Sequence, residues 1–387
     1  MTEHVERLNA SHFDEAMAFL NEVFAVHGPH DFARMLPGVY QPDDEHMQHN
    51  LALRRDGRLI SIVGVFPVTL HIGAERLRLA GIGGVSVAGD LQGQGHFDRM
   101  MRQARDAVGR DGYQLSHLNG RRHRYRRFGW EVTGTDLRCV IQPKNLAHAF
   151  TGAQLPSLSL EALSDAPDAT LVQRLLELHD SQVIHAERSA LRFPRLLRSW
   201  HHRALVARDE NGDVVGYASG DSEKRQIAEL VAASPRHAIA VLRAVAQRWD
   251  GKLELGLRAL PSELTDELGR IAEHVDLRAS GNWQIWDFAA VTAALLRARH
   301  AARALPDGRV VVRASGAAEC YALWVDGERA GCERIDAAPD LEAPLEELTR
   351  ILFGPLPPAL VRELPRAARA LSSWCPLPLG LSPLDQV

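Results

Sequence analysis

Residues 85–97, VSVAGDLQGQGHF, hold the pattern that decides the fold of this chain. The β-branched residues at its start are typical of the end of a strand, and Gly89, Gly93 and Gly95 indicate a turn. The residues that follow, FDRMMRQARDAVGRDG (97–112), have the apolar spacing of a helix. Backbone N–H groups of such a turn, together with the helix dipole, converge on one anion. The stretch therefore predicts a phosphate-binding loop, with a plain strand-to-helix turn as the alternative.

The loop fits neither of two common nucleotide-binding patterns. The second glycine of G-x-G is followed by His96, Phe97 and Asp98, so the third glycine of a Rossmann fingerprint is missing. No Gly-Lys-Ser/Thr follows either, which excludes a Walker loop.

The elements around the loop predict one α/β unit over residues 1–150. A helix is expected before the loop, and Asp56-Gly57 joins two strand-like runs as a hairpin. The expected elements are, in order, a helix over 11–26, a hairpin over 51–72, a strand over 77–87, the helix over 97–112, a strand over 113–120, a short basic helix, and a strand over 130–143 that completes the unit.

A similar order of elements returns over residues 151–291, after a linker rich in Ser, Pro, Ala and Asp at 150–170. We expect a second, degenerate copy of the unit, because no glycine-rich turn follows its strand at 227–233. Its expected elements are a helix over 169–186, a hairpin over 203–219, the strand over 227–233, a helix over 236–249, a strand over 252–257, a helix over 262–275 and a closing strand over 283–291.

The last segment, residues 292–387, is predicted to be a small α+β domain. Nine of the 20 prolines fall within residues 339–387, so short helices alternate there with extended segments. The fold class is thus α/β, with two mixed-sheet units and a smaller third domain.

Composition excludes several functional classes. A net charge of −4 over 387 residues argues against a nucleic-acid partner. No apolar run approaches the about 18 residues of a membrane span, and the N-terminus lacks the apolar core of a signal peptide, so we expect a cytoplasmic protein. Four cysteines without a CxxC pair predict neither disulfides nor a zinc knuckle. HExxH, GxSxG and EF-hand patterns are absent, so no metal and no serine nucleophile are expected.

A second informative segment, RRHRYRRFGW (121–130), places Tyr125 four residues before Gly129. With the loop, it resembles the GNAT acyl-CoA N-acyltransferase superfamily. Gln92 and Gly95 match V-x-V-x(4,6)-[Q/R]-x-x-G-x-[G/A], with Phe97 in the place of the usual small residue. Tyr125 and Gly129 match F-Y-x-x-x-G-[F/Y], with Arg124 before the tyrosine and Trp130 after the glycine.

The order of the three units resembles the enhanced intracellular survival (aminoglycoside acetyltransferase) family. That layout has two GNAT-like units and a sterol-carrier-like C-terminal domain. The resemblance implies that the first unit binds acetyl-CoA, that the chain forms a homo-oligomer (a hexamer), and that the C-terminal carboxylate, here on Val387, acts as the base.

Acetyl transfer from a thioester requires an anchored cofactor, a polarised carbonyl and a proton for the departing thiolate. Amides of residues 92–96 would hold the pyrophosphate, and the amides of Val85 and Val87 would pair with the pantetheine arm and polarise the carbonyl. Tyr125, with an ordinary pKa near ~10, suits the role of general acid, with a packing residue as the alternative. The residues expected at the cofactor are Val85, Ser86, Val87, Gln92, Gly93, Gln94, Gly95, His96 and Asn119.

The sequence specifies the base and the acceptor less closely than it specifies the cofactor site. An apolar tail, CPLPLGLSPLDQV (375–387), favours an ordered C-terminus, with a domain or subunit contact as the alternative reading. His117 is a second candidate for the base, acting through water. The acceptor is expected to be a primary amine on a small molecule or peptide. Carboxylates that would attract it, or merely solvate a loop, are Asp31, Asp43, Asp44 and Glu45.

Two further alternatives concern the whole chain. The Arg121–Arg127 run reads as a solvated helix face with one or two arginines near the cofactor phosphates, against a nucleic-acid patch. A non-catalytic acyl-CoA sensor or carrier and a lipid-binding protein remain alternatives to the enzyme, because fold does not fix function.

Overall fold

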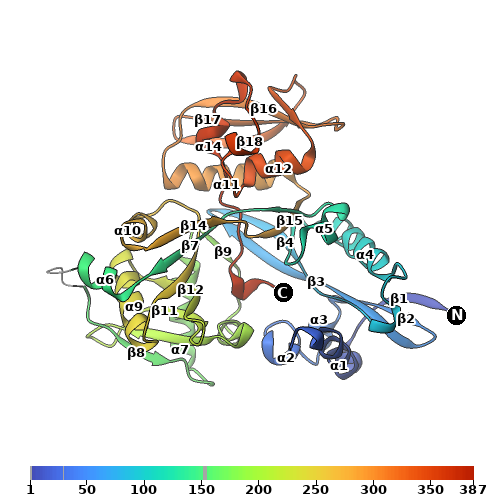
Figure 1. Ribbon diagram of the computed structural model, residues 1–387, viewed down its shortest axis with the longest axis horizontal. Helices are drawn as coiled ribbons and strands as arrows, with labels where there is room; N and C mark the ends of the chain where they lie inside the picture. The colour runs from blue at the N-terminus through green and yellow to red at the C-terminus, as the bar shows by residue number, and fades with distance from the viewer. Residues whose placement is uncertain (1, 29, 151–154) are drawn as a thin grey trace.

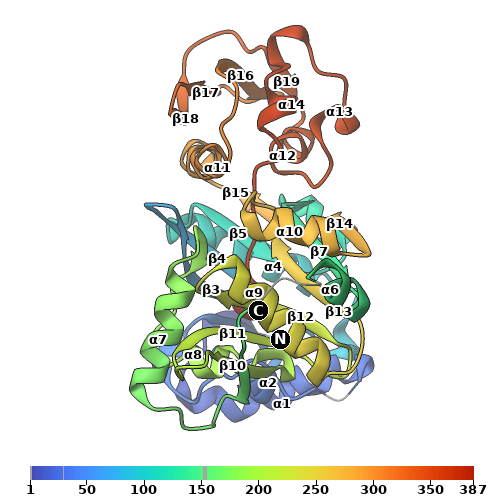
Figure 2. The same cartoon turned by 90° about the vertical axis from the view of Figure 1, so that its left-hand side faces the viewer.

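The computed structural model describes residues 2–28, 30–150 and 155–387, which form three β-sheets with helices packed against them. Two sheets lie side by side, and the third belongs to a separate unit above them (Figure 1, Figure 2). The predicted α/β fold with two mixed sheets and a smaller α+β unit is confirmed. The domain limits 1–150, 151–291 and 292–387 remain predictions, and residues 151–154 at the first limit lie outside the described residues.

The first sheet is antiparallel except for one parallel pair, β4 with β5. In spatial order its strands are β1 (Glu3–Arg7), β2 (Asn50–Arg55), β3 (Arg58–Ile72), β4 (Glu75–Val87), β5 (Leu115–Leu118), β15 (Gly281–Ile285) and β6 (Glu131–Thr133), with β9 (Ile184–Ala186) also beside β3. The helices and 3-10 turns of this unit are η1 (Ala10–His12), α1 (Phe13–Phe24), η2 (Ala25–His27), α2 (Phe32–Met35), α3 (Asp44–Met47), η3 (Gly89–Leu91), α4 (His96–Arg110), α5 (Arg122–Tyr125) and η4 (Arg126–Phe128).

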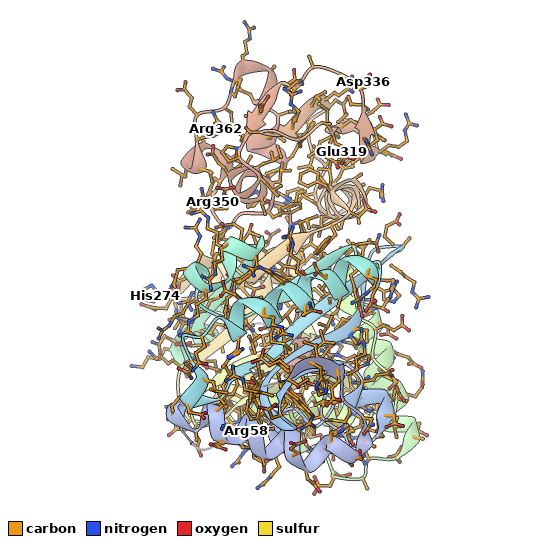
Figure 3. The ribbon with its side chains drawn as sticks, turned by 90° about the vertical axis from the view of Figure 1, so that its right-hand side faces the viewer. Arg58, His274, Glu319, Asp336, Arg350 and Arg362 are labelled. Atoms are coloured by element: carbon orange, nitrogen blue, oxygen red, sulfur yellow. The ribbon has the colours of Figure 1, made fainter. Side chains whose placement is uncertain are left out.

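Local chemistry explains the two best-predicted elements of this unit. Asp56 and Gly57 both have positive φ, 49° and 84°, as the predicted β2–β3 hairpin turn requires. Helix α4 buries an apolar stripe that includes Met100, Ala104 and Val108, and this stripe packs on the first sheet. Figure 3 shows α4 lying across that sheet.

The second sheet is also antiparallel except for one parallel pair, β12 with β13. Its strands are β14 (His274–Arg278), β7 (Asp136–Ile141), β13 (Leu253–Arg258), β12 (Gln226–Ala232), β11 (Val214–Asp221), β10 (Arg203–Arg208) and β8 (Ser159–Ala162). The helices of this unit are α6 (Pro143–Ala149), α7 (Ala169–Asp180), α8 (Phe193–Leu196), η5 (Ser199–His201), α9 (Pro235–Arg248) and α10 (Glu263–Ile271).

The two units exchange strands, which corrects the predicted closing strands of both. The predicted strand at 130–143 is two strands, β6 in the first sheet and β7 in the second. The predicted closing strand of the second unit, at 283–291, is β15 of the first sheet up to Ile285, and Phe288 already begins a helix. Each unit therefore completes its sheet with a strand from the other.

The chain crosses between the sheets at Gly134 and again before Gly281, and both glycines have positive φ (80° and 145°). A side chain at Gly134 would overlap the Ser280 hydroxyl, so the two crossings are in contact. The C-terminal tail runs past both: the Thr135 N–H and the Ser280 hydroxyl donate to the Leu379 carbonyl, at 2.8 and 2.9 Å. The C-terminal tail is thus hydrogen-bonded to both segments in which the chain crosses between the sheets.

Two predicted helices of the second unit are shorter than expected. The helix predicted over 169–186 ends at Asp180, and the rest forms β9, which pairs with β3 of the first sheet. The helix predicted over 262–275 ends at Ile271, and β14 follows as an edge strand. In both places a short strand follows the helix, where the sequence predicted that the helix continues.

The third unit contains a four-stranded sheet. A long helix, α11 (Phe288–Ala302), lies between this sheet and the first sheet. One apolar cluster, which includes Leu79, Leu115 and Leu295, spans the junction. Its strands are β18 (Arg329–Ile335), β17 (Cys320–Asp326), β16 (Gly308–Ala314) and β19 (Leu341–Ala343). Its helices are α11 (Phe288–Ala302), α12 (Leu345–Phe353), α13 (Pro358–Val361), η6 (Arg366–Ala368) and α14 (Leu371–Trp374), and η7 (Pro383–Asp385) lies in the tail.

From the third unit the tail descends between the two lower units and ends at their centre (Figure 1). Exposed charged and polar side chains such as Arg58, His274 and Asp336 lie at the periphery (Figure 3). Among the described residues, no helix has both the length and the apolarity needed to cross a bilayer.

Candidate active site

The candidate site is built where β4 and β5 separate. The parallel pairing between them ends at Ile82 and Leu118, and of the described strands only β3 accompanies β4 beyond that point. A bulge against β3 follows at Gly84, whose φ is 60° and where a side chain would lie 2.8 Å from the Tyr40 hydroxyl. The bulge bends the end of β4, so the edge carrying Val85 and Val87 faces open space.

The predicted phosphate loop follows at the end of this strand. Gly93 and Gly95 have φ of 78° and 85°, and a side chain added at either would meet no atom within 4 Å. Helix α4 begins at His96, and the Arg99 N–H is bonded to the Gly95 carbonyl at 3.1 Å. The N–H groups before Arg99 have no carbonyl partner within the helix, and they point toward the open side with the positive end of the dipole.

A cleft of about 690 Å³ lies beside the loop and the end of β4. Most of the predicted cofactor residues line it, and so does the predicted acid, but Gln94 and Asn119 do not. Asn119 instead donates from Nδ2 to Gln386 Oε1 at 2.7 Å and so holds the tail. The predicted residues at the cleft are Val85, Ser86, Val87, Gln92, Gly93, Gly95, His96 and Tyr125.

The His96 side chain is occupied by the fold. Its ring is buried, and Nε2 lies 2.8 Å from a guanidinium nitrogen of Arg55. The contribution of His96 to an anion is therefore its backbone N–H at the first position of α4.

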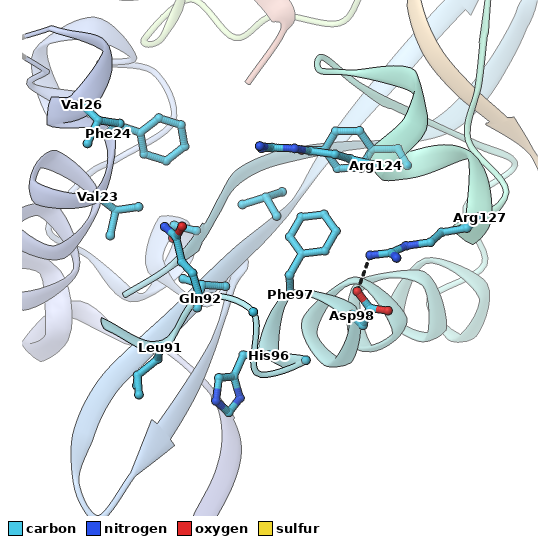
Figure 4. Close-up of a pocket in the computed structure, with 16 residues that line it drawn as sticks. Val23, Phe24, Val26, Leu91, Gln92, His96, Phe97, Asp98, Arg124 and Arg127 are labelled. Carbon is cyan, nitrogen blue, oxygen red and sulfur yellow. Dashed lines mark hydrogen bonds and ion pairs between the residues drawn. The ribbon is translucent and has the colours of Figure 1, made fainter. Parts of the chain in front are cut away.

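The opposite wall of the cleft was not predicted from the sequence. It consists of Val23 and Phe24 of α1 with Val26 of η2, and Figure 4 shows them facing Phe97 and Arg124 across the cleft. Val26 is 80% exposed, which is unusual for a large apolar residue. In the sequence, the apolar residues of α1 extend beyond those of its buried face. Apart from that, the sequence gives no signal that distinguishes these wall residues from ordinary core residues.

The departure from the motif at Phe97 has a structural explanation. Its ring packs near those of Tyr125 and Phe128, with centroid separations of 5.9 and 6.0 Å. Phe97 therefore forms part of the cleft wall, and α4 still begins at the expected place.

Tyr125 ends α5 and is 7% exposed. A side chain at Gly120, whose φ is 146°, would overlap the tyrosine ring, so this glycine permits the close approach. Burial raises the pKa of the Tyr125 hydroxyl, and the neighbouring Arg124 opposes the shift. The hydroxyl therefore remains protonated at neutral pH and can donate a proton into the cleft.

The basic run around Tyr125 is mostly occupied by ion pairs. Arg122 donates to Glu131 at 2.6 Å, Arg126 to Glu346 at 2.7 Å, and Arg127 pairs with Asp98 of α4. Among the described residues Arg124 has no acidic partner, and its guanidinium reaches into the cleft (Figure 4). Among the described arginines of the run, Arg124 is thus the one that lines the cleft without an acidic partner.

A second cavity, of about 410 Å³, contains the C-terminal residue Val387. A side chain at Gly83 of β4 would lie 2.8 Å from the carboxyl carbon of Val387, and one at Gly81 would lie 3.0 Å from its side chain. The C-terminus therefore ends against β4 immediately before the bulge. The cavity also brings together Glu45, Glu187, Asp385, His46, His49, Arg78 and Arg192.

Of the four carboxylates predicted to attract an amine, only Glu45 lines this cavity. Asp31 and Asp43 accept the backbone N–H groups of Arg34 and His46 as helix N-caps, and Asp44 accepts from the Ala10 N–H at 2.8 Å. These three carboxylates are bonded to backbone N–H groups, so they have local structural roles instead of facing the cavity.

His117 does not lie in either cleft. It is 1% exposed, its ring lies 4.6 Å from that of Trp283, and Nε2 is 3.2 Å from the Ser280 carbonyl. Burial lowers the pKa of His117 to about 4. The hypothesis that His117 acts as a base through water is therefore wrong, because this side chain is core.

Comparisons with known proteins give a family match for the first unit and a shared fold for the whole chain. Residues 4–133 match the family described as an acetyltransferase (GNAT) domain. No curated protein matches the chain.

Solved structures share the whole fold at low identity. A GCN5-related N-acetyltransferase from Kribbella flavida is 18% identical, with a TM-score of 0.68 over 100% of this chain and 98% of its own. Another from Anabaena variabilis is 15% identical, with a TM-score of 0.67 over 100% of both chains. Eis1 from Mycobacterium abscessus is 15% identical, with a TM-score of 0.65 over 99% of this chain and 100% of its own. The predicted tandem architecture is confirmed at the level of the fold.

Proposed function

We propose that this chain, whose residues 4–133 form a GNAT acetyltransferase domain, transfers an acetyl group from acetyl-CoA to a primary amine on a small molecule or peptide. One observation carries the proposal. The cleft with the glycine loop and Tyr125 is lined by the end of β4 at Val85 and Val87, and Val387, which lines the second cavity, ends against Gly83 of the same strand.

The loop and Arg124 suit the phosphates of the cofactor. The free N–H groups from Gly93 to the first turn of α4 form a cradle for the pyrophosphate, and the exposed guanidinium of Arg124 adds the charge that an anion requires. The edge of β4 at Val85 and Val87 offers backbone groups to the pantetheine arm. We therefore assign acetyl-CoA to the larger cleft, as acyl donor.

The reaction we propose is direct attack in a ternary complex. The amine nitrogen bonds to the thioester carbonyl carbon, whose oxygen is stabilised by backbone N–H groups of β4. The carbon–sulfur bond then breaks, and the Tyr125 hydroxyl gives its proton to the departing thiolate. The proton released by the attacking nitrogen goes to the C-terminal carboxylate of Val387.

The structural support for the base is the order of the tail. Leu377, Leu379, Leu381 and Leu384 are each no more than 1% exposed, so the last residues form part of the core instead of a frayed end. The carboxylate is thereby held beside β4, where an acceptor in the smaller cavity would present its amine.

The experiment that tests the function combines binding with turnover. We expect calorimetric titration with acetyl-CoA to show one saturable site, and thiol release to depend on an added amine from a panel of polyamines, aminoglycosides and peptides. Lack of binding at millimolar acetyl-CoA contradicts the proposal. Binding without amine-dependent thiol release identifies a sensor or carrier, and lipid that co-purifies without acetyl-CoA binding identifies a lipid-binding protein.

The role of the C-terminal carboxylate needs a separate test. Deletion of Val387 moves the carboxylate by one residue, and we expect kcat to fall about 100-fold with unchanged acetyl-CoA affinity, since a misplacement near 1 Å already costs that much. Val387→Leu is the matched control because it retains a carboxylate at the same position. Equal rates in the deletion and the control would dismiss the carboxylate as base.

A further inference from the structure

The second unit receives the tail at the position where the first unit has its cofactor cleft. In the second sheet the parallel strands β12 and β13 pair only at Gln226 and Ile227, and then separate as β4 and β5 do in the first. Against the separated part of β12, Ser382 of the tail donates to Glu229 Oε2 at 2.5 Å. The chain's own end thus occupies the groove that a second cofactor would need.

A buried arginine joins the tail to this strand. Arg188, which follows β9, donates to both oxygens of Glu229 at 2.7 and 2.8 Å and to both oxygens of Asp385 at 2.8 Å. The side chains of Arg188, Glu229 and Asp385 are 1%, 7% and 5% exposed. We call these three residues the tail clamp.

The clamp is completed by neutral donors. Tyr217 donates to Glu229 Oε1 at 2.8 Å, so Glu229 is bonded by Arg188, Tyr217 and Ser382 together. Buried ion pairs are weak devices for stability because desolvation offsets most of the Coulombic gain, but they hold their partners in one geometry. The geometry held here is that of the tail.

The position of the clamp along the chain shows what it fixes. Asp385 is two residues from the end, so the Val387 Cα lies within about 7 Å of the Asp385 Cα, since an extended chain spans about 3.5 Å per residue. Gln386 between them is bonded to Asn119 of the first unit. The last three residues are therefore held first by the second unit and then by the first.

We propose that Arg188 is a positioning residue for acetyl transfer: through Glu229 and Asp385 it holds the C-terminal carboxylate against Gly83. The second unit then serves the reaction as the holder of the chain's end and does not bind a cofactor of its own. This proposal rests on the base role of Val387 in the proposed function.

The first test measures the tail directly and needs no activity. In Asp385→Asn, we expect carboxypeptidase to release Val387 about tenfold faster or more than from the native chain, because removal of one partner of a buried ion pair is strongly destabilising for the segment it holds. Asp266→Asn is the matched control, since Asp266 pairs with Arg303 at an exposed site and neither residue belongs to the tail clamp. An unchanged release rate overturns the clamp, whatever the enzyme's activity.

The second test asks whether the clamp positions the base. For Asp385→Asn we expect kcat to fall about 100-fold with unchanged acetyl-CoA affinity and a changed pH profile of kcat. Faster release of Val387 with an unchanged kcat and pH profile overturns the positioning role. If native protein shows no transfer, the proposed function has failed, and the release assay still decides the clamp.

A second variant keeps the proposal open to contradiction if Asp385→Asn does not fold. Ser382→Ala removes one neutral donor to Glu229 and leaves all three charges paired. We expect it to fold and to shift both readouts in the same direction by a smaller factor. No shift in either readout, in a folded Ser382→Ala, contradicts the assignment.

Discussion

At the scale of single residues, the protonation state and the position of the Tyr125 hydroxyl depend on the groups around it. The positive φ of Gly120 lets the ring lie against the backbone, and burial raises the pKa of the hydroxyl, so the proton stays available at neutral pH. An acid in this position is required only when the thiolate departs, so its loss affects kcat and not the binding of the cofactor.

The substitution Tyr125→Phe tests this role. We expect kcat to fall about 100-fold or more, the size typical of a lost general acid, with acetyl-CoA affinity unchanged. Tyr321→Phe is a matched control, because Tyr321 lies on β17 of the third unit and lines neither the cofactor cleft nor the smaller cavity. Undiminished turnover in Tyr125→Phe would show that the tyrosine is a packing residue.

His117 leads to a prediction about acid stability. Its folded pKa of about 4 lies below the unfolded value of about 6.5, so between these pH values the unfolded chain binds a proton that the folded chain does not. Stability is therefore lost as the pH falls from 6.5 toward 4, by about 3 kcal/mol for a shift of this size.

Urea unfolding at several pH values measures the effect. We expect His117→Gln to be less stable at neutral pH, because it disturbs the core, and to lose about 3 kcal/mol less on acidification. His274→Gln, at an exposed position of β14, should retain the native pH dependence. An identical acid loss in His117→Gln and the native chain would contradict a neutral buried histidine.

At the scale of elements, the bulge of β4 and the glycine loop together create the cleft. The pairing of β4 with β5 ends at Ile82, and the bulge that follows bends β4 while it stays paired with β3. The two left-handed glycines then redirect the chain so that α4 begins with its N–H groups facing the open side. Since Gly93 and Gly95 meet no atom within 4 Å, their requirement for glycine is conformational and not one of space.

The substitution Gly95→Ala isolates this requirement. A left-handed alanine costs about 1–2 kcal/mol, so we expect acetyl-CoA affinity to fall about tenfold as the loop relaxes to another conformation. Gly89→Ala is the matched control: that glycine is equally open, with nothing within 4 Å, but lacks a positive φ. Equal affinity of both variants for acetyl-CoA, measured by calorimetry, would argue against the cradle.

At the scale of the whole molecule, the exchange of β7 and β15 makes the two lower units interdependent. β15 lies between β5 and β6, and its Trp283 is fully buried in the first sheet. Without β15, β5 becomes an edge and the apolar faces of Leu115 and Leu118 lose cover.

The fragment 1–150 therefore should not fold alone. We expect it to be insoluble, or soluble without a cooperative thermal transition by circular dichroism, whereas the full chain under the same conditions unfolds cooperatively. A soluble fragment 1–150 with a sharp transition and acetyl-CoA binding would show that the exchanged strand is dispensable.

Much of this architecture could be predicted from local signals in the sequence. The hairpin at Asp56-Gly57 and the helix after Gly95 depend on turn residues and on a 3.6-residue period, and both signals act over neighbouring residues. The expectation that Tyr125 belongs with the loop came from the resemblance of the two motifs to the GNAT superfamily, and both line the same cleft. The mixed α/β class followed from the order of such signals.

Tertiary structure alone decided which sheet each short strand joins and how the chain ends. Residues 131–133 and 136–141 lie within one predicted strand, and only the packing at Gly134 and around the tail sends its halves to different sheets. Arg188, Glu229 and Asp385 resemble solvated surface charges in the sequence, since Arg188 lies 41 and 197 residues from its two partners. Burial made those pairings specific, because a charge removed from water requires a partner in contact wherever that partner lies along the chain.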